Sequence, residues 1–160
     1  MTAKSRFDQA EKYREMMECA ESYVMENKLK ADAPDKVANF IRPLLVGLKQ
    51  EKLFVLMTDS KHRINHCEEI TVGLVDRSQV HPREVFRNAI IQSASCIVVA
   101  HNHPSGDPTP SSADIACTRQ LIEAGKIIGI QVTDHVIVGL SSDSFPGGYV
   151  SMRAEKLLDF

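Results

Sequence analysis

Hydrophobic residues recur along the chain with two different periods. Residues 7–27 and 37–48 carry apolar side chains every three or four positions, which is the spacing of an amphipathic helix. Pro34 separates these stretches, and Pro43 is expected to kink or shorten the second helix. Apolar runs at 53–57 and 96–100 are typical of buried strands, and residues 63–72 have the extended character of a hairpin partner.

The second half of the chain continues this alternation. A helix is expected from Pro82, because proline suits the first helical turn. A further helix is expected from Ser111 to Gly125. A strand over residues 127–138, a loop over residues 139–148 and a short last strand over residues 149–151 are expected to follow it. Strands that alternate with helices favour an α/β fold layered around one sheet.

Composition and charge narrow the class of protein. The 160 residues are long enough for one domain with a real core. A net charge of −2 gives no support for strong binding to nucleic acid through phosphates. No apolar stretch resembles a membrane span or a signal peptide, so we expect a cytoplasmic protein without membrane association. The four cysteines include no CxxC pair and are expected to be reduced.

The stretch HNHPSGDPTPSSAD, residues 101–114, carries the candidate chemistry. His101 and His103 lie two positions apart in an extended segment, so both imidazoles are expected on one face. A Pro/Gly-rich turn then returns the chain to Asp114, in the first turn of the next helix. Two imidazoles and one carboxylate form a three-ligand set that leaves the fourth position of zinc for water. The sequence therefore predicts one zinc ion per chain.

A simpler explanation exists for part of this stretch. Ser111 and Asp114 have the spacing of a helix capping box, and taken alone the cap is the better interpretation. The two histidines in the same short stretch favour a metal site, in which Ser111 serves both the cap and the chemistry.

The spacing His-x-His, seven residues, Ser, two residues, Asp is similar to the JAMM signature of MPN-type zinc metalloproteases, and HNHPSGDPTPSSAD resembles the bacterial RadC family, the UPF0758 group. LFVLMTDSKHRI, SQVHPREVF and TDHVIVG also resemble segments of that family, so the likeness covers residues 32–152. The resemblance implies an MPN (JAMM)-like mixed β-sheet flanked by helices over residues 34–156, after an N-terminal amphipathic helical extension over residues 1–33.

The resemblance also implies roles for single residues. It makes His101, His103 and Asp114 the zinc ligands and Ser111 the serine that steadies the tetrahedral intermediate. A general base is needed within reach of the attacking water. Glu84 is the candidate, because it lies in the first turn of the helix that leads to the histidine strand, and the alternatives are Glu68 and Glu69. His135, between apolar residues of a strand, is expected to be a core histidine or to contact a ligand.

The function implied is zinc-dependent hydrolysis of a peptide or isopeptide bond in a peptide or protein substrate, within a family named for DNA repair. The alternative is a non-catalytic metal-binding module associated with DNA repair or scaffolding. Full-length RadC proteins carry a helix-hairpin-helix module with a Gly-rich hairpin. Residues 1–30 of this chain do not contain such a hairpin. The chain resembles the short RadC-like proteins, and this segment is expected to serve packing or homo-oligomer formation rather than DNA contact.

Overall fold

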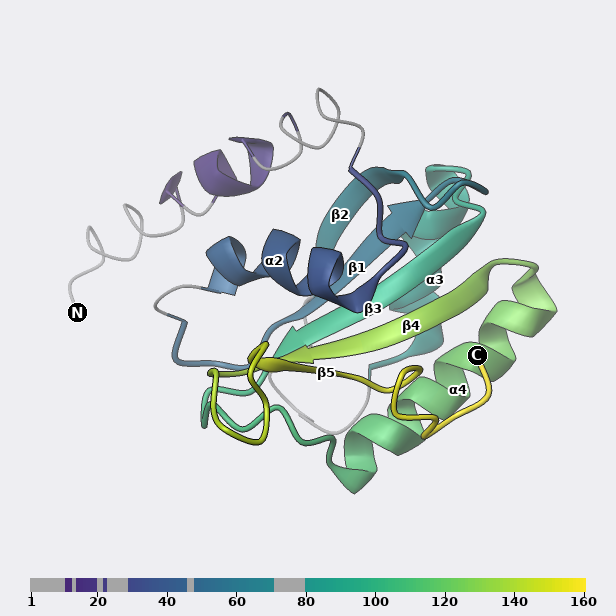
Figure 1. The fold of residues 1–160 in the computed structure, drawn as a ribbon. Coiled ribbons are helices and arrows are strands. Elements are labelled where there is room, and N and C mark those ends of the chain that lie inside the picture. Colours follow the sequence, from purple (N-terminus) through teal and green to yellow (C-terminus); the bar gives the residue numbers. More distant parts are fainter. Residues whose placement is uncertain (1–10, 13, 20–21, 23–28, 46–47, 71–79) are drawn as a thin grey trace.

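The computed structural model describes residues 11–12, 14–19, 22, 29–45, 48–70 and 80–160. Its strands form one mixed sheet in the order β2-β1-β3-β4-β5 (Figure 1). Strands β3 and β4 run parallel, and the other neighbouring pairs run antiparallel. The bounds are β1 Leu53–Thr58, β2 Ile64–Ile70, β3 Cys96–Asn102, β4 Gln131–Val138 and β5 Tyr149–Ser151.

Helices cover both faces of this sheet. Helix α2 (Pro34–Leu45) lies on one face, and α3 (Pro82–Ile91) and α4 (Ser112–Ile128) lie on the other (Figure 1). Because successive side chains of a strand point to opposite faces, alternate residues of β3 pack into two different cores. Val98 and Ala100 pack in the α2 core, whereas Ile97 and Val99 pack in the core beneath α3 and α4. The expected α/β fold with a mixed sheet flanked by helices is confirmed.

The end of α4 corrects one prediction. The helix continues past Gly125 to Ile128, and the next strand begins at Gln131 rather than at residue 127. Gly129 ends the helix, since its φ of +83° is a left-handed conformation that glycine adopts without strain. Gly125 has another role: a Cβ there would lie 2.5 Å from the carbonyl oxygen of Ile130. The glycine permits a close approach of helix and backbone.

Gly125→Ala is therefore expected to lower the free energy of unfolding by about 1–3 kcal/mol, the usual cost of overpacking. In an open helix the same change has the opposite sign and stabilises by up to about 1 kcal/mol. Denaturant unfolding measures the effect, with Ala116→Ser on the exposed side of α4 as the matched control. A Gly125→Ala variant as stable as the parent would show that α4 can move away from Ile130 without cost.

The turn between β1 and β2 is held by Asp59. Its carboxylate accepts hydrogen bonds from the backbone N–H groups of Lys61 at 2.8 Å and Arg63 at 3.0 Å, and from Arg63 Nε at 2.7 Å. The Arg63 backbone donor contributes most to a lowered pKa of Asp59, about 2. These bonds let the chain pass through His62, whose φ is +58°.

We expect this turn to make the free energy of unfolding fall as the pH is lowered into the acid range. Because the pKa of Asp59 is lower in the folded chain than its ordinary value of about 3.9, its contribution is complete above pH 4 and is lost as the pH falls towards 2. Thermal melting between pH 5 and pH 2 should show this slope, and Asp59→Asn should flatten it. An unchanged slope in Asp59→Asn would contradict the assignment.

The N-terminal extension is described only in part. Residues 11–12, 14–19 and 22 are helical, and Met16 and Met17 pack against the α2 core. The rest of the expected helix over residues 7–27 lies outside the described residues, so the bounds of the extension and its role in self-association stay predictions. No described helix combines the length and the apolarity that crossing a membrane requires. Cys19, Cys67, Cys96 and Cys117 form no disulfide with one another.

Candidate metal centre

The two histidines meet at the end of β3. His101 lies in the strand and is 1% exposed, and His103 follows it and extends the pairing with β4 through a 3.1 Å bond from its N–H to the Val138 carbonyl. The Nε2 atoms of the two rings lie 2.9 Å apart. The sequence prediction that both imidazoles share one face is therefore met.

The orientation of His103 is set by the turn that follows it. Its Nδ1 lies 2.7 Å from the backbone carbonyl oxygen of Asp107. A carbonyl only accepts, so Nδ1 carries the proton and Nε2 keeps its lone pair free for a ligand. Gly106, with a φ of +87°, reverses the chain here, and its N–H donates to the His103 carbonyl at 2.9 Å. The turn thus points Nε2 of His103 at His101.

Asp114 is brought to the histidines by the capping box of α4. Ser111 Oγ donates to Asp114 Oδ2 at 2.6 Å and accepts from the Asp114 backbone N–H at 3.2 Å, while the Ser111 N–H donates to Oδ2 at 2.7 Å. Oδ1 lies 3.4 Å from His101 Nε2, and Oδ2 lies 3.5 Å from His103 Nε2. The cap and the candidate metal site therefore use the same carboxylate, as the sequence suggested.

These distances fit a small tetrahedral ion. Zinc binds nitrogen and oxygen ligands at about 2.0–2.2 Å, which places tetrahedral ligand atoms roughly 3.3 Å apart. The two Nε2 atoms lie 2.9 Å apart, and each lies near that value from one oxygen of Asp114, with Oδ1 3.4 Å from His101 and Oδ2 3.5 Å from His103. Three protein ligands also leave the fourth position that catalytic zinc sites keep open. The residues present are thus a suitable donor set for a divalent metal.

Glu51 is the fourth member of this group, and the sequence reasoning missed it. One ligand atom from each of Glu51, His101, His103 and Asp114 lies within 4.8 Å of every other. Glu51 Oε1 is 3.9 Å from His101 Nε2, farther than the tetrahedral separation, and its side chain is 59% exposed. Glu51 therefore lies beside the other three residues and is open to solvent, so its carboxylate can contact a water molecule at the site.

Strand pairing places Glu51 there. Strand β1 pairs antiparallel with β3 with Leu53 opposite His101, so the residues just before β1 lie beside His103. Asn102, between the two histidines, holds this segment on both sides of Glu51. Its Oδ1 accepts from the Lys52 N–H at 2.8 Å, and its Nδ2 donates to the Gln50 carbonyl at 3.3 Å.

The three carboxylates considered from sequence lie outside this group. Glu84 is in the first turn of α3, as expected, and is paired with Arg83 Nε at 3.0 Å. Glu68 accepts a short hydrogen bond from Asn88, and Glu69 is paired with Lys52. In the described part of the chain, Glu51 is therefore the carboxylate that joins the two histidines and Asp114.

The charge states of His101 and Asp114 suit metal binding, whereas the contact with Asp114 raises the pKa of His103. Burial lowers the pKa of His101 to about 4, so its ring is neutral at pH 7 and its contacts with carboxylates are not ion pairs. Burial would raise the pKa of Asp114, but the contact with the His103 ring and the hydrogen bonds from Ser111 outweigh it and hold that pKa well below its usual range. Burial, and then repulsion from Asp114, raises the pKa of Glu51. A neutral imidazole and an ionised carboxylate are the forms that bind metals.

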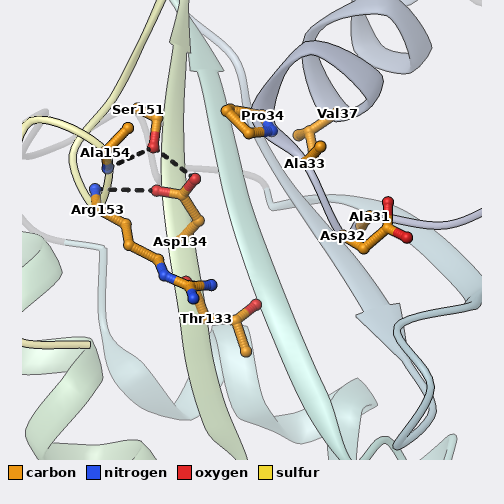
Figure 2. Close-up of a pocket in the computed structure, with 10 residues that line it drawn as sticks. All are labelled: Ala31, Asp32, Ala33, Pro34, Val37, Thr133, Asp134, Ser151, Arg153 and Ala154. Atoms are coloured by element: carbon orange, nitrogen blue, oxygen red, sulfur yellow. Dashed lines mark hydrogen bonds between the residues drawn. The ribbon is translucent and has the colours of Figure 1, made fainter.

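The pocket drawn in Figure 2 lies elsewhere, on the α2 face of the sheet. Its volume is about 150 Å³, and Asp134 of β4 is its most buried carboxylate (Figure 2). Asp134 accepts from the Ser151 hydroxyl at 2.6 Å and from the N–H groups of His135 at 2.7 Å and Arg153 at 3.2 Å. Since both carboxylate oxygens already have donors, Asp134 fastens β4 to the C-terminal turn.

Comparison with known proteins gives matches that cover most of the chain. A family model described as a RadC-like JAB domain matches residues 31–157. A UPF0758 protein of Alkaliphilus oremlandii is 48% identical over 132 residues, which cover 82% of this chain and 54% of the relative. One of Methanosarcina mazei is 41% identical over 135 residues, 84% of this chain and 56% of the relative. The chain spans about half the length of the curated relatives it matches.

Proposed function

The chain belongs to the RadC-like JAB domain family, and we propose that it is a zinc-dependent hydrolase that cleaves a peptide or isopeptide bond. The observation that carries this proposal is the asymmetry of the four-residue group. His101, His103 and Asp114 are at tetrahedral separations, whereas Glu51 lies 3.9 Å from His101 Nε2 and faces solvent. A purely structural site would be closed by a fourth ligand.

Zinc in such a site acts as a Lewis acid and lowers the pKa of water to about 7. We propose Glu51 in place of Glu84 as the general base. Glu51 accepts a proton from the attacking water and returns it to the leaving amine. The two hydrogen bonds between the Asn102 side chain and the backbone of Gln50 and Lys52 keep Glu51 beside the histidines.

Ser111 has two proposed roles. In the structure its hydroxyl donates to Asp114 Oδ2 and orients that carboxylate. During the reaction the hydroxyl donates to the developing oxyanion, where a positioned donor lowers the barrier.

Ser111→Ala is expected to lower both stability and turnover. Loss of the cap costs about 1 kcal/mol, and loss of an oxyanion donor costs about 10²–10³-fold in turnover. Denaturant unfolding and turnover should be measured on the same preparation, with Ser112→Ala on the exposed first turn as control. A fall in stability without a fall in turnover would restrict Ser111 to the cap.

The proposed substrate is a peptide or a protein. The 59% exposure of the Glu51 side chain opens the site to solvent, so that a long chain has access to it. Zinc-loaded protein should be profiled on a peptide library that includes lysine-linked isopeptides. Cleavage that stops on chelation and returns with zinc supports the proposal. A zinc-loaded protein that cleaves no member of the library would favour the non-catalytic metal-binding module instead.

A further inference from the structure

A buried chain of hydrogen bonds lies behind His101, on the side away from Asp114 Oδ1. His101 Nδ1 lies 2.8 Å from His135 Nε2 of β4, and His135 Nδ1 lies 2.5 Å from Thr118 Oγ1 of α4. Thr118 Oγ1 in turn donates to the backbone carbonyl of Asp114 at 2.6 Å. His101, His135 and Thr118 are each at most 1% exposed. The chain therefore links two of the proposed ligands, His101 and Asp114, without reaching solvent.

Counting protons fixes the direction of these bonds. The Asp114 carbonyl only accepts, so the single hydroxyl proton of Thr118 points to it. Thr118 Oγ1 must then accept from Nδ1–H of His135. A neutral imidazole has one N–H, so His135 Nε2 is an acceptor and takes the proton of His101 Nδ1. The opposite direction would leave two oxygens 2.6 Å apart with no proton between them.

We propose that Thr118 and His135 are positioning residues that hold His101 as the Nδ1–H tautomer, so that its Nε2 lone pair faces the metal. This inference rests on the proposed metal site, because it explains how one ligand is prepared for binding. The Asp107 carbonyl does the same for His103 with one bond. His101 is buried, and among the described residues its Nδ1 contacts His135 rather than a loop carbonyl, so the chain through His135 takes this role.

The surroundings of His135 make it a firm partner. Its backbone N–H donates to Asp134, and its carbonyl accepts from the Met152 N–H at 2.9 Å. Met152 also contacts Thr118, with Sδ 3.4 Å from the hydroxyl oxygen. The C-terminal turn shown in Figure 2 thus fastens β4 from the opposite face, through the Asp134 bonds to Ser151 and Arg153. The backbone of His135 is therefore fixed by its neighbours, and both of its ring nitrogens have a partner.

Thr118→Val tests the proposal, because valine keeps the shape of threonine and removes the hydroxyl. Zinc affinity should be measured by chelator competition, and long-range ¹H–¹⁵N spectra of the metal-free protein should report which nitrogen of His101 carries the proton. Outer ligand partners are typically worth about 10- to 100-fold in metal affinity, and we expect a loss of that size. Thr118→Ser is the matched control: it keeps the hydroxyl, and we expect zinc affinity within about threefold of the parent.

The two variants separate positioning from packing. Serine leaves a small void in a buried site and valine does not, so a packing role would make Thr118→Ser the weaker zinc binder. Equal zinc affinity of Thr118→Val and the parent, or an Nε2–H tautomer of His101 in the parent, would overturn the proposal. Neither readout needs a peptide substrate. If the parent cleaves no peptide but shows the Nδ1–H tautomer, which Thr118→Val disturbs, the proposed hydrolase fails and the positioning role stands.

Discussion

Glu51→Gln is expected to retain its zinc while turnover on a cleavable peptide falls by about 10²–10⁴-fold, the usual scale for a lost general base. Glutamine keeps the shape of the side chain and its distance from His101, but it cannot accept the proton of the attacking water. Zinc should stay bound, because His101, His103 and Asp114 hold it without Glu51. Steady-state kinetics together with the zinc content of the same preparation measure both parts of this result.

Glu84→Gln is the matched control for that experiment. Glu84 is the base that the sequence suggested, and in the structure its side chain is 44% exposed and paired with Arg83. Its turnover should equal that of the parent. If Glu51→Gln kept the turnover of the parent and Glu84→Gln lost it, Glu84 of α3 would be the general base and the proposed role of Glu51 would be refuted.

The double variant His101→Ala, His103→Ala is expected to lose its zinc, from about one ion per chain to none. Removing both imidazoles leaves Asp114 and the exposed Glu51, and two carboxylates without nitrogen donors are too few ligands to hold zinc tightly. Elemental analysis of protein purified without added metal gives the answer directly. A parent protein that also lacks zinc would contradict the predicted metal site.

His81→Ala serves as the control for the double variant. His81 precedes α3, its side chain makes no cap hydrogen bond, and it is exposed. Its zinc content should equal that of the parent. Unchanged zinc in the double variant would place the metal elsewhere and remove the basis of the proposed function.

The features that the sequence predicted well are local ones. His101 and His103 share a face because of the two-residue period of a strand, and Asp114 follows Ser111 at the spacing of a capping box. Each relation spans only a few residues. The three candidate metal ligands could therefore be placed relative to one another before any tertiary contact was known.

Glu51 depends on strand pairing, and for that reason sequence reasoning missed it. Fifty residues separate it from His101, and the two meet because Leu53 pairs with His101 in the antiparallel β1–β3 ladder. Hydrophobic pattern alone does not determine which strands pair or in what register. One signal was present in the sequence: an acidic residue, Glu51, lies two positions before the apolar strand that begins at Leu53. The signal for Glu84 was weaker, because it rested only on the position of its helix before the histidine strand in the sequence.

The boundary between α4 and β4 was misplaced for a related reason. Gly125 and Gly129 are both plausible helix ends, and the choice depends on backbone conformation and on the approach of Ile130. For His135 the sequence left two interpretations, a core histidine and a contact to a ligand. The structure shows a buried core histidine whose ring lies 2.8 Å from Nδ1 of His101, which is a proposed ligand.

We propose that His101, His103 and Asp114 bind one zinc ion, with Glu51 beside it but not coordinating it. Anomalous diffraction at the zinc edge from crystals of the zinc-loaded protein tests this most directly. We predict one peak per chain, about 2.0–2.2 Å from both Nε2 atoms and from an Asp114 carboxylate oxygen, with Glu51 outside that distance. A peak that Glu51 ligates directly to close the site, or one remote from His101 and His103, would contradict the account.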